Sequence, residues 1–142
     1  MNTKTNEDRA NAYLEEAALS LESAKSIFNE ATKTGKQLWA HVVKIAYDGM
    51  EQAISSALSA KGFAIPKEHP AKISSFLNNY KPGAKTESIL LFWLRKRSKS
   101  QYVDIIEETI SVPHKIFNES DAEKAIGDCK FIINFIKQLI SK

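Results

Sequence analysis

Apolar residues recur every three or four positions over much of the chain, which is the spacing that places them on one face of an α-helix. Thr5 followed by Asp8 resembles a capping box, and Gly35 suits the left-handed end of a helix. The apolar stripe between them consists of Leu14, Ala17, Leu21, Ala24 and Phe28. We therefore predict a first helix over about Asp8–Ala31, preceded by a polar tail over residues 1–7.

A second helix is predicted over Gln37–Ala60, closed by Gly62, and it has two apolar stripes instead of one. The first contains Leu38, Val42, Ile45, Gly49 and Ala53; the second contains Trp39, Val43, Ala46, Met50, Ile54 and Ala57. A helix that is apolar on two sides belongs at the centre of a bundle. Its remaining stripe is polar and consists of His41, Lys44, Asp48, Glu51 and Ser55.

The second half of the chain predicts three more helices. Pro70 fits the first position of a short helix that ends at Lys81-Pro82-Gly83. The run of six apolar residues Ile89–Leu94 fits a helix or a buried strand; helix is favoured because there is no second strand to pair with it. That helix should run from Thr86 to Asp104, or as far as Glu108, with a loop over Val112–Asn118. Ser120 to Glu123 form a capping box for the last helix.

These elements predict an all-α fold, an up-and-down bundle of four or five helices in a single domain over residues 1–142. Only five glycines and four prolines leave little room for the turns of an all-β fold. The second and last helices carry more apolar surface than one small bundle needs. We therefore expect a homodimer.

The single cysteine and the lack of a recognisable secretion signal predict a cytoplasmic protein. The net charge of +3, from 20 basic and 17 acidic residues, is only mildly basic. Cys129 is the single cysteine, so an internal disulfide is excluded; we expect a buried, inert thiol in a reducing compartment. No secretion signal and no apolar run long enough to cross a bilayer is seen, so no membrane partner is expected.

The strongest candidate for chemistry is a dense basic cluster, Arg95, Lys96, Arg97 and Lys99, at the end of the run Ile89–Leu94. Guanidinium groups match phosphate oxygens, and four cations in five residues would bind an RNA backbone. The alternative is an ordinary solvated helix face. Tyr102 lies five positions after Arg97, about 500° around an ideal helix, so the two converge only if the helix ends or bends between them.

Other polar residues carry weaker signals. His41, His69 and His114 are far apart in the sequence and none has the spacing of a metal ligand pair, so we expect no metal and no cofactor. His41 and His69 are expected to be surface or capping residues. Asp48 and Glu51 lie three apart on one helical face and could act together as an acidic helper. Neighbouring surface carboxylates are the alternative.

The chain resembles the HEPN domain family over almost its whole length. The segments that carry the resemblance are Arg9-Ala10, Tyr13-Leu14, Ala17–Ala24, Ala46-Tyr47, Glu51–Ala53, the connector Pro66–His69, Arg97–Tyr102 and Ala122–Leu139. The resemblance implies a bundle similar to the substrate-binding subunit of nucleotidyltransferases. Such domains commonly dimerise, and many act as toxins beside a minimal nucleotidyltransferase that serves as antitoxin. Catalytic members are metal-independent endoribonucleases in which an Arg and a His, four to six residues apart, act on the RNA.

By this resemblance Arg97 holds the phosphate, and Tyr102 occupies the position of the catalytic His. A phenol, with a pKa of about 10, is a poorer base than an imidazole at neutral pH, so enzymatic activity is uncertain. The leading hypothesis is a dimer that binds RNA or a nucleotide through a basic cleft, lined by Arg97, Tyr102 and Lys99 with Glu51 as an acidic helper. It would work with a nucleotidyltransferase in a toxin–antitoxin or defence system. The alternatives are an active endoribonuclease toxin and a helical module that binds only proteins.

Overall fold

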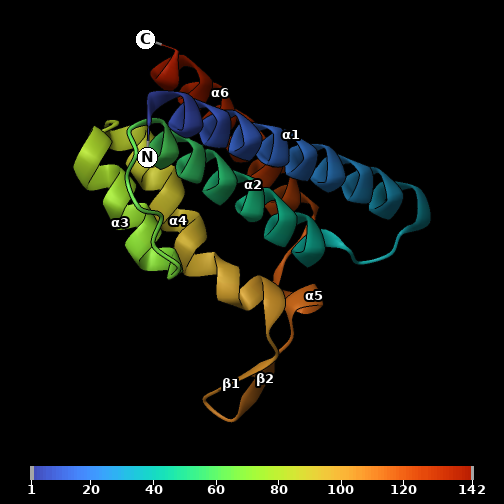
Figure 1. The fold of residues 1–142 in the computed structure, drawn as a ribbon. Coiled ribbons are helices and arrows are strands. Elements are labelled where there is room, and N and C mark those ends of the chain that lie inside the picture. Colours follow the sequence, from blue (N-terminus) through green and yellow to red (C-terminus); the bar gives the residue numbers. More distant parts are fainter. Residues whose placement is uncertain (1, 142) are drawn as a thin grey trace.

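The computed structural model describes residues 2–141, which form six helices and one small hairpin (Figure 1). In chain order the elements are α1 Thr3–Thr34, α2 Trp39–Ala60, α3 His69–Tyr80, α4 Ala84–Gln101, β1 Asp104–Ile106, β2 Thr109–Ser111, α5 Pro113–Ile116 and α6 Glu119–Ile140. The predicted all-α class is confirmed. Within the described residues, no helix has the length and apolar character needed to span a membrane.

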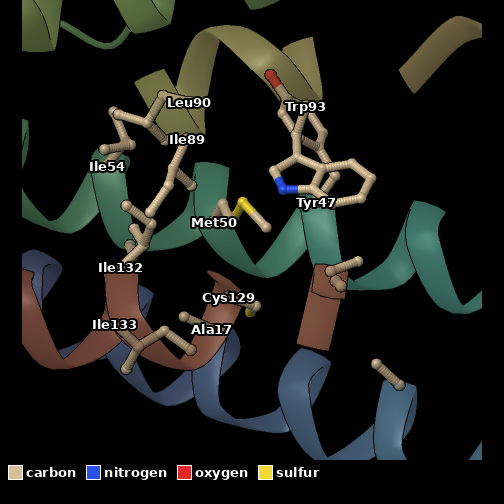
Figure 2. Close-up of a cluster of buried hydrophobic side chains, with 14 of the residues drawn as sticks. Ala17, Tyr47, Met50, Ile54, Ile89, Leu90, Trp93, Cys129, Ile132 and Ile133 are labelled. Carbon is tan, nitrogen blue, oxygen red and sulfur yellow. The ribbon is translucent and has the colours of Figure 1, made fainter. Parts of the chain in front are cut away.

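Helix α2 lies at the centre of the bundle, as its two apolar stripes predict. It contacts α1, α3, α4, α5 and α6. Figure 2 shows Tyr47, Met50 and Ile54 of α2 between side chains of α4 on one side and of α6 and α1 on the other. The three α2 side chains are 0–1% exposed. The fold therefore depends on a single core that surrounds α2.

Helix α1 packs closely on α2 through small side chains. Its buried residues are Ala10, Ala17, Ala24 and Ala31, one every seven positions. Gly49 of α2 faces this stripe: a Cβ added there would lie 2.8 Å from Cys129 Sγ and 3.4 Å from the Ala17 carbonyl oxygen. The two backbones can approach this closely because neither helix has a larger side chain at the contact.

Two helix starts differ from the predictions. Helix α1 begins at Thr3, five residues before the predicted start, because the Asn2 side chain accepts a hydrogen bond of 2.9 Å from the Thr5 amide. Residues 3–7 are therefore helical and not part of a polar tail. The predicted capping box at Ser120 is also wrong. The cap is Asn118, which exchanges hydrogen bonds of 2.9 and 3.0 Å with Asp121.

The region after α4 is the largest difference from the sequence prediction. The run Ile89–Leu94 is helical as predicted, but α4 ends at Gln101, and the predicted continuation to Asp104 or Glu108 is wrong. An antiparallel hairpin follows, in which Ile105 pairs with Ile110. Its turn, Glu107-Glu108, has positive φ at both residues, 48° and 67°. Two glutamates give no sequence signal for such a turn, which usually contains Asn or Gly.

Candidate functional site

Glu51 is a buried carboxylate that joins α2 to α3. Its Oε2 lies 2.6 Å from His69 Nδ1, and its Oε1 accepts a hydrogen bond of 3.1 Å from Lys72 Nζ. His69 and Lys72 are three residues apart in α3, so both can reach the same carboxylate from one helix face. The polar stripe predicted on α2 thus points partly inward. His69, predicted to be a surface or capping residue, binds Glu51 instead.

The surroundings of Glu51 favour its charged form. Burial by itself raises the pKa of the Glu51 carboxyl, but Tyr47, the His69 hydrogen bond and the nearby Lys72 ammonium outweigh burial and lower it. The Tyr47 hydroxyl is close to Glu51 but has no hydrogen-bond partner among residues 2–141. Burial and then the negative charge of Glu51 raise the pKa of Tyr47, so this phenol stays protonated.

Arg97 of α4 lies near the same region of α2. Its charge lowers the pKa of Tyr47 and of Asp48, although larger effects outweigh it at both groups. The pKa of Asp48 is nevertheless raised, mainly by burial and further by the charge of Glu51. The result is a polar cluster that links three helices and consists of Tyr47, Asp48, Glu51, His69, Lys72 and Arg97.

One nitrogen of Arg97 is left without a partner. Arg97 Nε is buried and forms no hydrogen bond within the described part of the chain. None of the three ion pairs found among residues 2–141 involves Arg97 either. Buried donors in proteins are almost always paired, so the unpaired Nε–H is an exception. The guanidinium of the half-buried Arg97 is therefore not engaged by a protein carboxylate in the described residues.

The position of Arg97 depends on how α4 is held against α6. Trp93, one turn before Arg97, is 1% exposed, and its Nε1 donates a hydrogen bond of 2.8 Å to Asp128 Oδ2. Asp128 also accepts a 2.6 Å hydrogen bond from Lys124. This contact fixes the rotation of α4 and keeps Arg97 on the side that faces α2.

The other cations of the basic cluster point in different directions. Arg95 and Lys99 are exposed. The Lys96 ammonium lies 5.6 Å from the centre of the Phe92 ring, one turn back along α4. The basic end of α4, which we define as Arg95, Lys96, Arg97 and Lys99, therefore combines two solvent-exposed cations with one inward-facing guanidinium.

Tyr102 lies apart from the polar cluster. It is the first residue after α4 and is 58% exposed. With Lys99 it lines a hollow of about 330 Å³ at the base of the hairpin; the other lining residues are Ser98, Val103, Asp104, Ile106 and Ser111. Arg97 does not line this hollow. The end of α4 at Gln101 does not by itself bring the guanidinium and the phenol into contact.

Asp48 and Glu51 do lie together, as their spacing predicts. Both line a polar hollow of about 280 Å³ between α1, α2 and α3, with Tyr13, Ser20, Gln52, Ser55, Ile65 and Lys72. Ser20 Oγ donates a hydrogen bond of 2.6 Å to Gln52 Oε1 at its edge. In residues 2–141, no three His, Cys, Asp or Glu side chains are arranged to hold a metal ion.

Three residues of the polar cluster were not selected from the sequence: Tyr47, His69 and Lys72. The only local signal is the pair His69 and Lys72, three apart at the start of a short helix. Their common partner, Glu51, is 18 and 21 residues away. Only the packing of α3 across α2 brings them together. Cys129, in contrast, is buried as expected, and burial raises the pKa of its thiol to about 12.

Comparison with known proteins agrees with the fold and with the extent of the bundle. None of the curated proteins compared with the chain matches it. A family model of the HEPN domain matches residues 8–139, which span the bundle from α1 to α6 and include the polar cluster and the basic end of α4. The chain therefore belongs to the HEPN domain family.

Proposed function

We propose that this protein binds RNA or a nucleotide through phosphate groups at the basic end of α4, with Arg97 as the central contact. The observation that carries the proposal is the buried Nε of Arg97, which has no hydrogen-bond partner in the described residues. Membership of the HEPN family supports an RNA- or nucleotide-related helical module. The identity of the ligand within that class is part of the proposal.

The electrostatics around Arg97 support this role. Burial and the charge of Glu51 raise the pKa of Tyr47, so this phenol stays neutral, and none of the ion pairs found in the described residues joins Asp48 to Arg97. Glu51 is charged, but its two oxygens already bind His69 and Lys72. The guanidinium is therefore oriented by α2 without a carboxylate bound to it, and its planar fork can pair with phosphate oxygens.

Arg95 and Lys99 would extend the contact along a nucleic-acid backbone. Both are exposed and flank Arg97 on α4. Contacts of this kind release counterions, so binding weakens steeply as the salt concentration rises. On a plot of the logarithm of the affinity against the logarithm of the salt concentration, the affinity falls with a slope of about 0.7 per phosphate contacted on a single strand. Lys96, placed over the Phe92 ring, is expected to contribute less.

We also propose that the chain acts as a homodimer in the cytoplasm with a minimal nucleotidyltransferase partner, in a toxin–antitoxin or defence system. Family membership supports this setting. Co-purification of the two proteins when they are expressed together would test the partner. A stable complex that does not need Arg97 and that binds no RNA would favour the alternative of a protein-interaction module.

The proposal is tested by the affinity for a fluorescently labelled single-stranded RNA over a series of salt concentrations. Wild type should bind at low salt, and Arg97→Ala should weaken binding by about tenfold or more, as expected for a charged hydrogen bond worth about 1.5–3 kcal/mol. Arg9→Ala, on α1, is the matched control and should bind like wild type. Absence of binding at low salt, or equal affinities for wild type and Arg97→Ala, contradicts the proposal.

A second candidate function is metal-independent RNA cleavage, and the orientation of His69 favours it. Glu51 holds Nδ1 of this imidazole at 2.6 Å, as carboxylates do for imidazoles that transfer protons. The His69 side chain is 36% exposed, so a substrate can reach it. Cleavage in the presence of a chelator, lost in His69→Ala and kept in Tyr102→Phe, would establish this activity. Loss in Tyr102→Phe would assign the role to the phenol instead.

A further inference from the structure

The hairpin of β1 and β2 projects away from the helical bundle (Figure 1). Most of the large apolar side chains that are exposed in the described residues lie in this hairpin or in the two residues before it. In the described part of the chain, the large apolar residues that are exposed are Leu19, Tyr102, Val103, Ile105, Ile106, Ile110 and Ile116. Five of these seven lie between positions 102 and 110. Exposed apolar residues gathered in one place mark an interaction surface more often than scattered ones do.

One face of the hairpin is entirely apolar. Ile105 lies directly opposite Ile110, so the two share a face, and Val103 joins them because it is two residues before Ile105. The three side chains are 66% (Val103), 71% (Ile105) and 64% (Ile110) exposed. We call these three residues the apolar hairpin face. A lone two-stranded hairpin is marginally stable in water, so a partner that covers this face would stabilise it.

The charges at the two ends of the hairpin are opposite. Its tip is Glu107-Glu108, both exposed. At its base lie Lys99 of α4 and Lys115 of α5, also exposed, and α4 and α5 contact each other. The exposed Asp104 lies there too, so the base carries two cations and one acid and is basic on balance. An antiparallel pair of such hairpins would place each acidic tip beside the basic base of the other. A parallel pair would bring like charges together.

From this self-complementary arrangement we infer that the apolar hairpin face binds the same face of a second copy of the chain about a twofold axis. The inference rests on the homodimer of the proposed function and names the surface that forms it. A twofold contact uses the same patch on both partners, which this pattern of charges satisfies.

Sedimentation velocity of the full chain over about a hundredfold range of concentration tests the inference. The face is smaller than the roughly 800 Å² per partner of a standard interface, so a dimer that dissociates on dilution is expected. The double variant Ile105→Thr/Ile110→Thr keeps β-branched residues in both strands and should weaken association by about tenfold or more. Leu19→Gln removes an equally exposed apolar residue from α1 and should leave association unchanged.

Exchanged charges test the antiparallel arrangement directly. Glu107→Lys/Glu108→Lys and Lys99→Glu/Lys115→Glu should each weaken self-association. A mixture of the two variants should associate more strongly than either alone, because opposite charges again face each other. A mixture no stronger than its components overturns the arrangement.

The result also separates this inference from the RNA-binding proposal. A dimer unaffected by Ile105→Thr/Ile110→Thr overturns the hairpin as the contact surface. A chain that is monomeric throughout overturns both the surface and the homodimer, while RNA binding that depends on Arg97 would still stand. A dimer formed by the hairpin, with equal RNA affinity for wild type and Arg97→Ala, supports the inference and contradicts RNA binding through Arg97.

Discussion

Glu51 of α2 and His69 of α3 are joined by a contact of 2.6 Å between Oε2 and Nδ1. The Glu51 side chain is 7% exposed and that of His69 is 36% exposed, so the pair lies at the edge of the core. Lys72 completes the pairing of the carboxylate. This contact fixes the short helix α3 beside the part of α2 on which Arg97 acts.

Removal of the Glu51 charge should destabilise the protein in a pH-dependent way. We expect Glu51→Gln to reduce the free energy of unfolding at pH 7 by about 1–3 kcal/mol, a value discounted for the partial exposure of His69. The folded pKa of Glu51 lies below its unfolded value, so the unfolded chain binds more protons between the two. The stabilisation is therefore fully present at pH values above the unfolded pKa of Glu51, about 4.3. It is lost as the pH falls through the lower pKa of the folded state.

Urea unfolding at a series of acidic pH values measures this effect. Glu51→Gln should lose less stability on acidification than wild type does. The control is Glu68→Gln: Glu68 precedes α3, is exposed, and its side chain makes no capping hydrogen bond. If acidification destabilises Glu51→Gln as much as wild type, the contact between Glu51 and His69 contributes nothing to the pH dependence of stability.

The close approach of α1 and α2 predicts opposite effects for two glycine substitutions. Gly49→Ala places a Cβ 2.8 Å from Cys129 Sγ and should cost about 1–3 kcal/mol despite the better helix propensity of Ala. Gly127→Ala, on α6, meets no atom within 4 Å and should stabilise by about 0.5–1 kcal/mol. The thermal unfolding midpoints of the two variants, compared with that of wild type, test both predictions. A stabilising Gly49→Ala would mean that α1, α2 and α6 pack less tightly than described.

Asp128 should matter for both stability and RNA binding. Asp128→Ala removes the acceptor of the buried Trp93 indole N–H, at a cost of about 1–3 kcal/mol in unfolding free energy. It should also weaken RNA binding, because Trp93 fixes the rotation of α4 that places Arg97. Lys124→Ala removes the exposed partner of Asp128 and the contacts of its ammonium with the Phe92 and Trp93 rings, but it leaves the Trp93 hydrogen bond in place and should cost less than about 1 kcal/mol. Equal effects of the two substitutions on unfolding would contradict this role of the Trp93 contact.

The sequence was sufficient to predict the bundle, because helical periodicity over α1, α2 and α6 and the left-handed stop at Gly35 are local signals. The hairpin could not be predicted, since its turn consists of two glutamates with positive φ and its strands have only three residues each. The contact between Glu51 and His69 is tertiary, and no pattern on α2 distinguishes its buried carboxylate from an exposed one. The sequence indicates Arg97 and the acidic pair Asp48 and Glu51 as site residues, but it does not indicate His69 and Lys72 as the partners of Glu51.

The central claim, that Arg97 contacts the phosphate, can be observed directly by NMR of the arginine side chains. The chain contains only three arginines, Arg9, Arg95 and Arg97, so the Nε–H spectrum has three signals that single Arg→Lys variants assign. During titration with a single-stranded RNA, the Arg97 signal should shift furthest and saturate, because its Nε gains the hydrogen-bond acceptor it lacks in the free protein. An Arg97 signal that stays in place while Arg9 or Arg95 responds would contradict the account.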